Sequence, residues 1–362
     1  MRNPAWDAAV LDAKRLVARA QKCQLYQFCD SFANDQGIWD SGFGNAMIWS
    51  ASYYRFPPPA GFPAGGVKFG LGHVTKNMLS NQATFIPKFG IKFISLPGSG
   101  AAAFFAVLDT GTAQWTLQVT AAGALAIYSG ATIEASTGVG LITTNTWYGI
   151  ELSVTVSTAG GTATVWVNGT QVINVTGIRT QQSANAYGNQ IGWGDIGVTG
   201  LSGYITDLRV WDNTGATQNA PLGTDSRMIT KMASGAGAVT QFTPNGAAAN
   251  WQCTDEVPPD DDTTYVSNST AGNADAYAMP IAGFTVAPAM VVARSRARKD
   301  DGATRALEIG VDSSGSIAVG SPVTMGSSYA WLDTCIALDP HTSAAWTAAG
   351  ADAAQHYKVE ST

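Results

Sequence analysis

The glutamates of this 362-residue chain are few and widely spaced. Glycoside hydrolysis needs two carboxylates about 5 to 9 Å apart, and on a strand such a pair would appear at positions i and i+2 or i+4. The chain has only five glutamates, and none lies in an E-x-D-x-x-E or E-x-D-x-E arrangement. Glu151 alternates with Ile150 and Leu152, so we expect an outward-facing, solvated carboxylate. The sequence therefore predicts no catalytic residue and no enzyme.

Metal ligands are also scattered. The three histidines lie far apart with no i, i+4 pair, so no zinc ligand set is predicted. Calcium is the one cofactor left open, through Asp30, Asp35 and Asp40 or through residues 260–262, although no EF-hand spacing is present. We therefore predict no metal site and no cofactor, with calcium as the alternative.

Aromatic side chains remain as candidate ligand-binding groups, because their flat faces can stack on sugar rings. The chain has 11 Trp, 11 Tyr and 13 Phe residues. Trp166 and Trp211 alternate within predicted strands and are expected in the core. The predicted ligand-binding residues lie outside such strands or beside the proline-rich segment 56–66, with core packing as the alternative for the set: Trp39, Trp49, Tyr53, Tyr54, Tyr187 and Trp193.

The composition favours a charge-poor, hydrogen-bonding surface. Charged residues make up 13% of the chain, against about 25% in typical domains. The formal net charge of −6 provides no field that would gather a polyanion, so nucleic acid is not an expected partner. We also expect neither a signal peptide nor a membrane span. The four cysteines are expected to be mostly reduced, with a Cys23–Cys29 bridge as the alternative.

The pattern of residues 147–175 predicts an all-β fold. Its first strand alternates apolar and polar residues with a period of two, as in a half-buried antiparallel strand. Gly160-Gly161 is expected to supply positive φ angles, and Asn168-Gly169 a type I′ hairpin turn. Further strands are predicted at 25–32, 47–54, 67–71, 84–93, 102–108, 115–120, 125–128 and 203–211. Such regular short strands are typical of a sandwich.

Residues 4–22 form the one predicted helix. Pro4 suits its first turn, and alanine, leucine, lysine and arginine favour the helical state. One stripe is spaced as a docking or self-associating face, with packing on the chain's own domain as the alternative: Trp6, Val10, Ala13, Val17 and Ala20.

A second block follows the polar segment 213–224, which is the predicted linker. It contains an acidic loop at 255–262 and a predicted hairpin, 289–298 with 303–311. Arg294, Arg296 and Arg298 share one face of this hairpin. We expect a solvated face whose arginines pair with Asp300, Asp301 or Glu308, and a contact to an anionic partner or another subunit is the alternative.

The chain also resembles a known family. FCDSF (28–32), NTWYGIEL, VWVNGTQV and LSGYITDLRVWDNTG (201–215) look like the concanavalin A-like, laminin-G-type jelly roll of tailed-bacteriophage virion proteins. The segment 239–277, followed by VVARSRARKDDGATRALEIGV and DPHTSAAWTAAGADAAQHYKV, looks like the second β-sandwich that follows this jelly roll in phage proteins.

The resemblance implies an all-β chain with a helical anchor (1–24), a jelly roll (25–212), the linker and a smaller C-terminal β-sandwich (225–362). It implies a non-enzymatic structural protein of a phage particle, tail-associated, that forms homo-oligomers, contacts other virion proteins and is released by lysis. Host-surface polysaccharide is the potential ligand. A head decoration or head-spike protein and a glycan depolymerase are the alternatives.

Overall fold

The computed structural model describes residues 26–30, 48–50, 66–70 and 72–361, apart from residues 198, 216, 217, 225, 227, 257 and 258. Nearly all its regular elements are antiparallel strands, which confirms the predicted all-β class. The described part of the chain forms two compact units, one within Leu25–Thr230 and the other within Lys231–Thr362. No helix in the described ranges is long and apolar enough to span a membrane.

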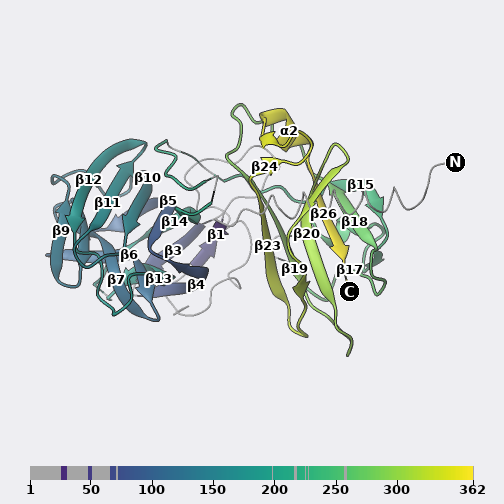
Figure 1. The fold of residues 1–362 in the computed structure, drawn as a ribbon, viewed down its shortest axis with the longest axis horizontal. Helices are drawn as coiled ribbons and strands as arrows, with labels where there is room; N and C mark the ends of the chain where they lie inside the picture. The colour runs from purple at the N-terminus through teal and green to yellow at the C-terminus, as the bar shows by residue number, and fades with distance from the viewer. Residues whose placement is uncertain are drawn as a thin grey trace. The chain divides into compact units, whose positions relative to one another are not determined.

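The first unit is a jelly-roll sandwich of two antiparallel sheets (Figure 1). The strands of its larger sheet are β1 (Tyr26–Asp30), β2 (Ile48–Ser50), β3 (Gly66–Gly70), β5 (Thr84–Ser95), β10 (Trp147–Thr155), β11 (Gly161–Val167), β12 (Thr170–Ile178) and β14 (Ser202–Asp212). Their order is β12-β11-β10-β5-β14-β3-β2, and β1 also pairs with β14.

The smaller sheet has the order β4-β13-β6-β7-β8-β9. Its strands are β4 (His73–Gln82), β6 (Ala101–Asp109), β7 (Thr112–Thr120), β8 (Leu125–Ser129), β9 (Thr132–Ser136) and β13 (Gly188–Ile196). Aromatic side chains fill the space between the sheets. Phe89 of β5 stacks on Phe105 of β6, with ring centroids 5.3 Å apart, and Phe93 meets Phe104 edge to face at 5.1 Å. These contacts join the central strands of both layers.

The two predicted turns have different outcomes. Asn168 and Gly169 both have positive φ, 52° and 81°, and join β11 to β12, which confirms the predicted hairpin. A hairpin also joins β10 to β11 at Gly160-Gly161, but the predicted positive φ angles are wrong, because neither residue adopts one. A Cβ on Gly161 would lie 2.6 Å from the carbonyl oxygen of Ile178. Glycine is therefore required there by close packing of the strands.

Three strands of the smaller sheet were not predicted: β4, β9 and β13. β13 has the sequence GNQIGWGDI, and its glycines resemble turn signals. A Cβ on Gly188 would overlap Val107 and lie 2.9 Å from the Phe85 ring. The glycine allows the two layers to approach, so a residue pattern typical of a loop forms a strand in the middle of a sheet.

Glu151 is not the solvated carboxylate that its alternation predicts. It points away from the sandwich core, yet only 2% of its surface is exposed. It forms an ion pair with Arg209 of β14 and accepts hydrogen bonds from the backbone N–H groups of Leu222 (3.0 Å) and Gly223 (2.8 Å). The segment after β14 therefore covers this part of the outer sheet face.

The contacts of residues 222–224 with the outer sheet face also change the end of the predicted linker. Residues 222 and 223 bind Glu151, and the carbonyl oxygen of Thr224 accepts a hydrogen bond of 3.0 Å from the buried Lys88 amine. Asp207 accepts one from the Met228 N–H. The end of segment 213–224 is thus part of the first unit, which extends to Thr230.

The second unit contains a six-stranded antiparallel sheet. Its strands are β15 (Gly235–Thr240), β18 (Ala274–Ala278), β20 (Ala306–Ser313), β21 (Ser316–Val319), β22 (Val323–Thr324) and β26 (Gln355–Glu360). Smaller elements are β16 (Thr243–Asn245), β17 (Tyr265–Ser267), β24 (Leu338–Asp339), β25 (Ala344–Ala345), the 3-10 helix η1 (Asn250–Cys253) and the helix α2 (Ala348–Ala353).

A separate two-stranded sheet, β19 (Val291–Ala297) with β23 (Ala330–Ile336), packs on the larger one. Ala293 and Ile336 join Val311 and Trp346 in a buried cluster between these strands and β20. The predicted hairpin of 289–298 with 303–311 is therefore wrong, because β19 pairs with β23 while β20 pairs with β26 and β21. β19 and β20 are therefore not hydrogen-bonded neighbours, and β19 instead packs its apolar face on β20.

Several predictions fall outside the described residues. They concern the helix at 4–22 with its stripe (Trp6, Val10, Ala13, Val17, Ala20), the proline-rich segment and the bridge from Cys23 to Cys29. Cys253 and Cys335, both in the described part of the chain, are free and buried.

Replacing Glu151 tests the buried ion pair. We expect Glu151→Ala to lower the free energy of unfolding of the first unit by about 3 to 5 kcal/mol, because it leaves the buried Arg209 guanidinium uncompensated. Denaturant unfolding of the full chain measures this. Glu134→Ala is the control, since Glu134 is partly exposed and accepts only a 3.3 Å hydrogen bond from the Arg179 N–H. Equal effects of the two substitutions would contradict the expected role of Glu151.

Candidate functional site

A row of aromatic and lysine side chains crosses the outer face of the larger sheet. Trp147 of β10 lies opposite Lys92 of β5, and Lys92 lies opposite Tyr204 of β14. Tyr204 in turn lies opposite Lys68 of β3. Because neighbouring strands are about 4.8 Å apart, four adjacent strands span about 14 Å, the length of roughly three sugar rings. We call these four residues the aromatic–lysine row.

Three side chains of the row, those of Lys92, Trp147 and Tyr204, are in contact. The Lys92 amine lies 4.8 Å from the ring centroid of Tyr204 and 5.3 Å from that of Trp147. The two rings are 6.3 Å apart, with an interplanar angle of 43°. All four residues are half-buried, so each presents part of its surface to solvent. Two rings that flank a cation form a preformed surface for a flat, polar ligand.

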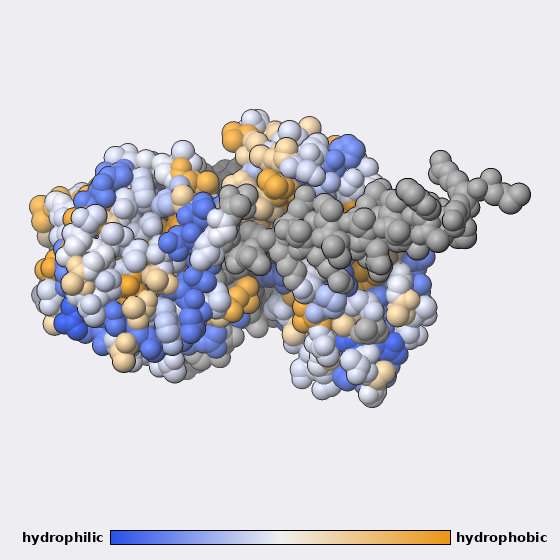
Figure 2. Space-filling view, viewed as in Figure 1, coloured by the Kyte–Doolittle hydropathy of each residue, from blue (hydrophilic) through white to orange (hydrophobic). Residues whose placement is uncertain are grey.

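The charge of the row distinguishes it from its surroundings. It carries two ammonium groups and no carboxylate, in a chain of net charge −6. Most of the visible surface in Figure 2 consists of weakly polar residues, with scattered strongly hydrophilic and apolar ones. This agrees with the charge-poor surface that the composition predicts. A local pair of lysines is therefore a distinctive feature of the outer sheet face.

The structure separates the predicted ligand-binding residues. Trp193 lies in β13, is fully buried and meets Phe69 edge to face at 6.4 Å, so this prediction is wrong. Tyr187 is half-buried and precedes β13. Trp49 is placed by its backbone in β2, opposite Val67, and its side chain lies outside the described residues, as do Trp39, Tyr53 and Tyr54.

The core predictions for two strand tryptophans also differ in outcome. Trp211 is 1% exposed, but it lies on the outer sheet face beneath the Arg209 guanidinium, 3.8 Å from its ring centroid. Trp166 is only half-buried and lies opposite Glu151 on that same outer face, so its core prediction is wrong. The row itself could not be identified from spacing, because residues 68, 92, 147 and 204 meet only once the strand order is known.

Tyr187 belongs to a loop fixed by one buried glutamine. The Gln114 amide donates hydrogen bonds to the Ser183 hydroxyl and to the carbonyl oxygens of Asn185 and Tyr187, all within 2.8 Å. Asp109 accepts hydrogen bonds from Ser183 and Asn185, which lower the pKa of its carboxyl group. The donors occupy the carboxylate, so the loop is held rigidly without a ligand.

The arginine face of β19 is paired within the chain. Arg294 forms two hydrogen bonds with Asp333 of β23, at 2.6 and 2.8 Å. Arg296 and Arg298 bind Asp261 and Asp262 of the acidic loop, each at 2.8 Å. The expected pairing with Asp300, Asp301 or Glu308 is wrong, because the acidic loop lies over β19. Asp261 and Asp262, two of the alternative calcium ligands, are therefore engaged by arginines.

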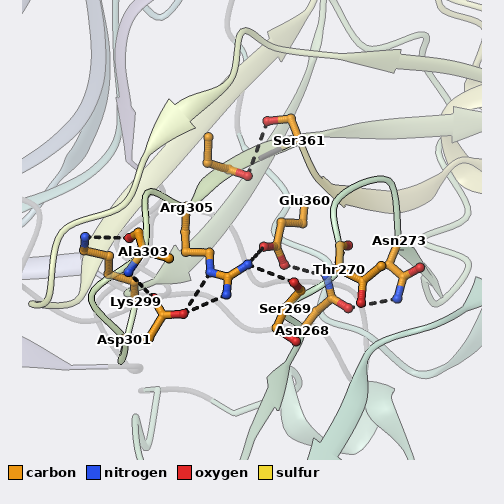
Figure 3. Close-up of polar contacts among 11 residues, drawn as sticks. Asn268, Ser269, Thr270, Asn273, Lys299, Asp301, Ala303, Arg305, Glu360 and Ser361 are labelled. Atoms are coloured by element: carbon orange, nitrogen blue, oxygen red, sulfur yellow. Dashed lines mark hydrogen bonds and ion pairs between the residues drawn. The ribbon is translucent and has the colours of Figure 1, made fainter.

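A further network fastens the end of β26 (Figure 3). Arg305 donates hydrogen bonds to Asp301 (2.7 Å), to Glu360 (2.9 Å) and to the carbonyl oxygen of Ser269 (2.9 Å). Glu360 also accepts a hydrogen bond from the Asn268 amide. The hydrogen bond from Arg305 lowers the pKa of the Asp301 carboxyl group. One guanidinium thus joins two carboxylates and a backbone carbonyl oxygen, so the network stabilises the unit and its hydrogen-bonding groups are engaged within the chain.

Polar side chains also occupy the interior of the second unit. His356 of β26 is half-buried beside Tyr277, with ring centroids 6.0 Å apart, and its Nε2 lies 3.2 Å from the Ser295 hydroxyl. Burial, together with the charge of Lys358, lowers the pKa of His356 to about 3. His356 is therefore neutral in the folded protein. Within the described ranges no three His, Cys, Asp or Glu side chains are grouped to hold a metal ion.

The comparisons with known proteins concern the jelly roll. Residues 88–217 match the concanavalin A-like lectin/glucanases superfamily. The first unit therefore contains a concanavalin A-like jelly-roll domain, as its two sheets indicate. No curated protein matches the chain.

Three solved structures illustrate the likeness. Domain 4 of an extracellular arabinanase from Geobacillus stearothermophilus, in complex with arabinotriose, is 12% identical, with coverage of 53% of this chain and 93% of that one and a TM-score of 0.36. A carbohydrate-binding module from Bacillus subtilis is 14% identical (46% and 98% covered, TM-score 0.29). An alginate lyase is 17% identical (41% and 80% covered, TM-score 0.30).

Acid should destabilise the second unit through His356. The folded side chain takes up a proton only near pH 3, whereas in the unfolded chain it does so near pH 6.5. The unfolded state therefore binds more protons between these values, and stability falls as the pH falls from about 6.5 to 3. We expect His356→Gln to show a smaller loss of Tm between pH 7 and pH 4.5 than the wild type.

Thermal unfolding of the full chain followed by circular dichroism measures the effect. His341→Gln, at an exposed position, is the control and should keep the pH dependence of the wild type. If His356→Gln also kept it, acid sensitivity would have to come from other groups.

Proposed function

We propose that the first unit binds host-surface polysaccharide through the aromatic–lysine row, and that the ligand carries carboxylate groups. The observation that carries the proposal is the placement of the Lys92 amine between the rings of Trp147 and Tyr204. Rings can stack on the apolar faces of sugars, and the ammonium groups of Lys92 and Lys68 can pair with uronate carboxylates. The match to a superfamily of lectins and glucanases supports a carbohydrate ligand.

Binding without hydrolysis is the proposed activity. The first unit contains two glutamates, Glu134 and Glu151. Glu151 is engaged by Arg209 and by two backbone N–H groups beneath the segment 222–224, which makes it a poor general acid. This supports a protein that is not an enzyme over a glycan depolymerase.

The proposed setting is a phage particle. It is supported by the resemblance of residues 25–362 to tailed-phage virion proteins, with a tail-associated position proposed over a head decoration or head spike. In this setting the segment 1–24 would bind other copies of the chain or other virion proteins, and the jelly roll would contact the host surface. Calcium is not expected at the row, because its only charged groups are the ammonium groups of Lys68 and Lys92.

Substitution of Trp147 tests polysaccharide binding. We expect Trp147→Ala to weaken binding of polygalacturonate about tenfold, because stacking and cation–π contacts contribute about 1 to 1.5 kcal/mol. Lys92→Met should weaken binding of this acidic polymer and leave any binding of neutral dextran unchanged. Isothermal titration calorimetry measures both.

Tyr128→Ala is the matched control, since Tyr128 is half-buried on β8 of the other sheet. Wild-type affinity in Trp147→Ala would contradict the proposed site. Loss of binding in Tyr128→Ala but not in Trp147→Ala would move the site to the smaller sheet.

The assembly proposal has its own test. We expect light scattering to give an oligomer, a trimer or larger, for the full chain and a monomer for a chain that begins at residue 25. Exposure of the stripe from Trp6 to Ala20 in a monomer would be unfavourable, which is the physical reason for this expectation. Monomers in both cases would contradict self-association through residues 1–24.

A further inference from the structure

Asp275 is the centre of a buried polar cluster in the second unit. Its carboxylate, in β18, is fully buried and accepts four hydrogen bonds. Oδ1 accepts from the backbone N–H groups of Gln241 (2.7 Å) and Phe242 (2.9 Å). Oδ2 accepts from the Tyr277 hydroxyl (2.8 Å) and from the Asn250 amide (2.6 Å). These bonds fix the Asn250 side chain at the start of η1.

Both donor hydrogens of the Asn250 amide are thereby used. One bonds Asp275 and the other the carbonyl oxygen of Phe242, at 2.8 Å. The amide nitrogen is thus held against a carboxylate. The two hydrogen bonds together keep the whole amide group, including its carbonyl carbon, in one orientation. Asn250 is 6% exposed.

Lys358 enters the same cluster from β26. It lies directly opposite Asp275 in the antiparallel ladder, and it is 7% exposed. Its amine lies 4.8 Å from the ring centroid of Tyr277 and 5.4 Å from that of Phe242. Within the described part of the chain this amine has no ion pair and no hydrogen bond.

The surroundings of Lys358 favour its neutral form. Burial lowers the pKa of the amine to about 8, against the opposing effect of the Asp275 charge. About a tenth of the amine is then a free nucleophile at pH 7. Desolvation in an apolar pocket is a general way to activate a lysine nucleophile.

The strand register places Lys358 next to the carboxylate that holds the Asn250 amide. Residues directly opposite each other in an antiparallel pair have Cβ atoms about 5 Å apart. The four-carbon stem of Lys358 can cross this distance to the groups around the Asp275 carboxylate. Holding two reactants in one site makes their reaction effectively unimolecular. An amine, an amide and a proton-accepting carboxylate therefore share one water-poor site.

We propose that Lys358 and Asn250 form an intramolecular isopeptide bond. The Nζ of Lys358 attacks the Cγ of Asn250, the Cγ–Nδ2 bond breaks, and one molecule of ammonia leaves. Asp275 takes the proton that the attacking nitrogen loses and returns it to the departing Nδ2, which it already contacts. Atoms and electrons balance without an oxidant, a cofactor or a metal. Asp275 acts as the general base and acid of the reaction.

The bond would fasten the C-terminal strand to the start of η1. Without it, β26 is held by hydrogen bonds to β18 and β20 and by the Arg305 network. A covalent link between residues 250 and 358 restricts the unfolded chain in the way that a disulfide does. The two cysteines of the unit, Cys253 and Cys335, are free and form no such link.

The test is the intact mass of the denatured full-length protein. We expect the wild type to be lighter than its sequence by one ammonia molecule, and tryptic digestion to yield one branched peptide that contains Asn250 and Lys358. Lys358→Met and Asp275→Ala should each have the full sequence mass. Lys231→Met is the control, because Lys231 is another lysine of the unit, half-buried and paired with Asp352, and it should keep the deficit.

The wild-type mass tests the proposal by itself, so the test does not depend on whether a variant folds. A wild-type mass equal to that of the sequence would overturn the proposal. So would a deficit that persists in Lys358→Met, since loss of ammonia would then come from Asn250 alone, by cyclisation onto its own backbone.

Discussion

The jelly roll depends on the position of β5 between β10 and β14. Both neighbours pair with it along most of its length, and most of its side chains are buried. Phe85, Phe89 and Phe93 point into the sandwich, so Lys88 and Lys92 must point outward. A slip of one residue would exchange these two sets and put charges into the core. The aromatic core thus fixes the register, and the register fixes both outer features.

Lys88 and Lys92 illustrate how one sheet face can carry two kinds of surface. They lie four residues apart on the same face, yet Lys88 is 4% exposed and Lys92 is half-buried. The segment 222–224 covers Lys88 and supplies a carbonyl oxygen to its amine, while the neighbouring Glu151 and Arg209 neutralise each other. Lys92 has aromatic neighbours in place of that cover. A covered ion pair contributes to stability, and an uncovered cation between rings remains available to a ligand.

The sequence contains enough information for the class of fold and for local features, since these depend on short-range patterns. The alternation around Ile150 and the Asn168-Gly169 turn are of this kind, and the structure confirms both. The burial of Glu151 is not, because alternation shows only which face a side chain occupies, and its cover comes from residues 71 and 72 positions away. The same holds for β13, where Gly188 allows layer contact.

The candidate site depended even more on long-range order. Residues 68, 92, 147 and 204 have no spacing that would link them in the sequence, and they meet because β3, β14, β5 and β10 are neighbours. The sequence predicted aromatic stacking, the chemistry on which the proposed site also depends, but it selected Trp193, which the core requires. Large aromatic residues serve both purposes, and only the strand order distinguishes them.

The interior of the second unit raises a different question, which is why a small domain buries Asp275, His356 and Lys358 together. Each costs free energy to remove from water, and an apolar core of equal volume would often be more stable. Four donors satisfy Asp275, and His356 is half-buried and neutral, so these two costs are limited. The Lys358 amine lies over the rings of Phe242 and Tyr277, and the Asp275 charge only partly offsets the cost of its burial. Conversion of this amine and the Asn250 amide into one neutral amide would remove the free-energy cost of burying the Lys358 charge. Folding would then favour formation of the isopeptide bond, and the bond would in turn stabilise the fold.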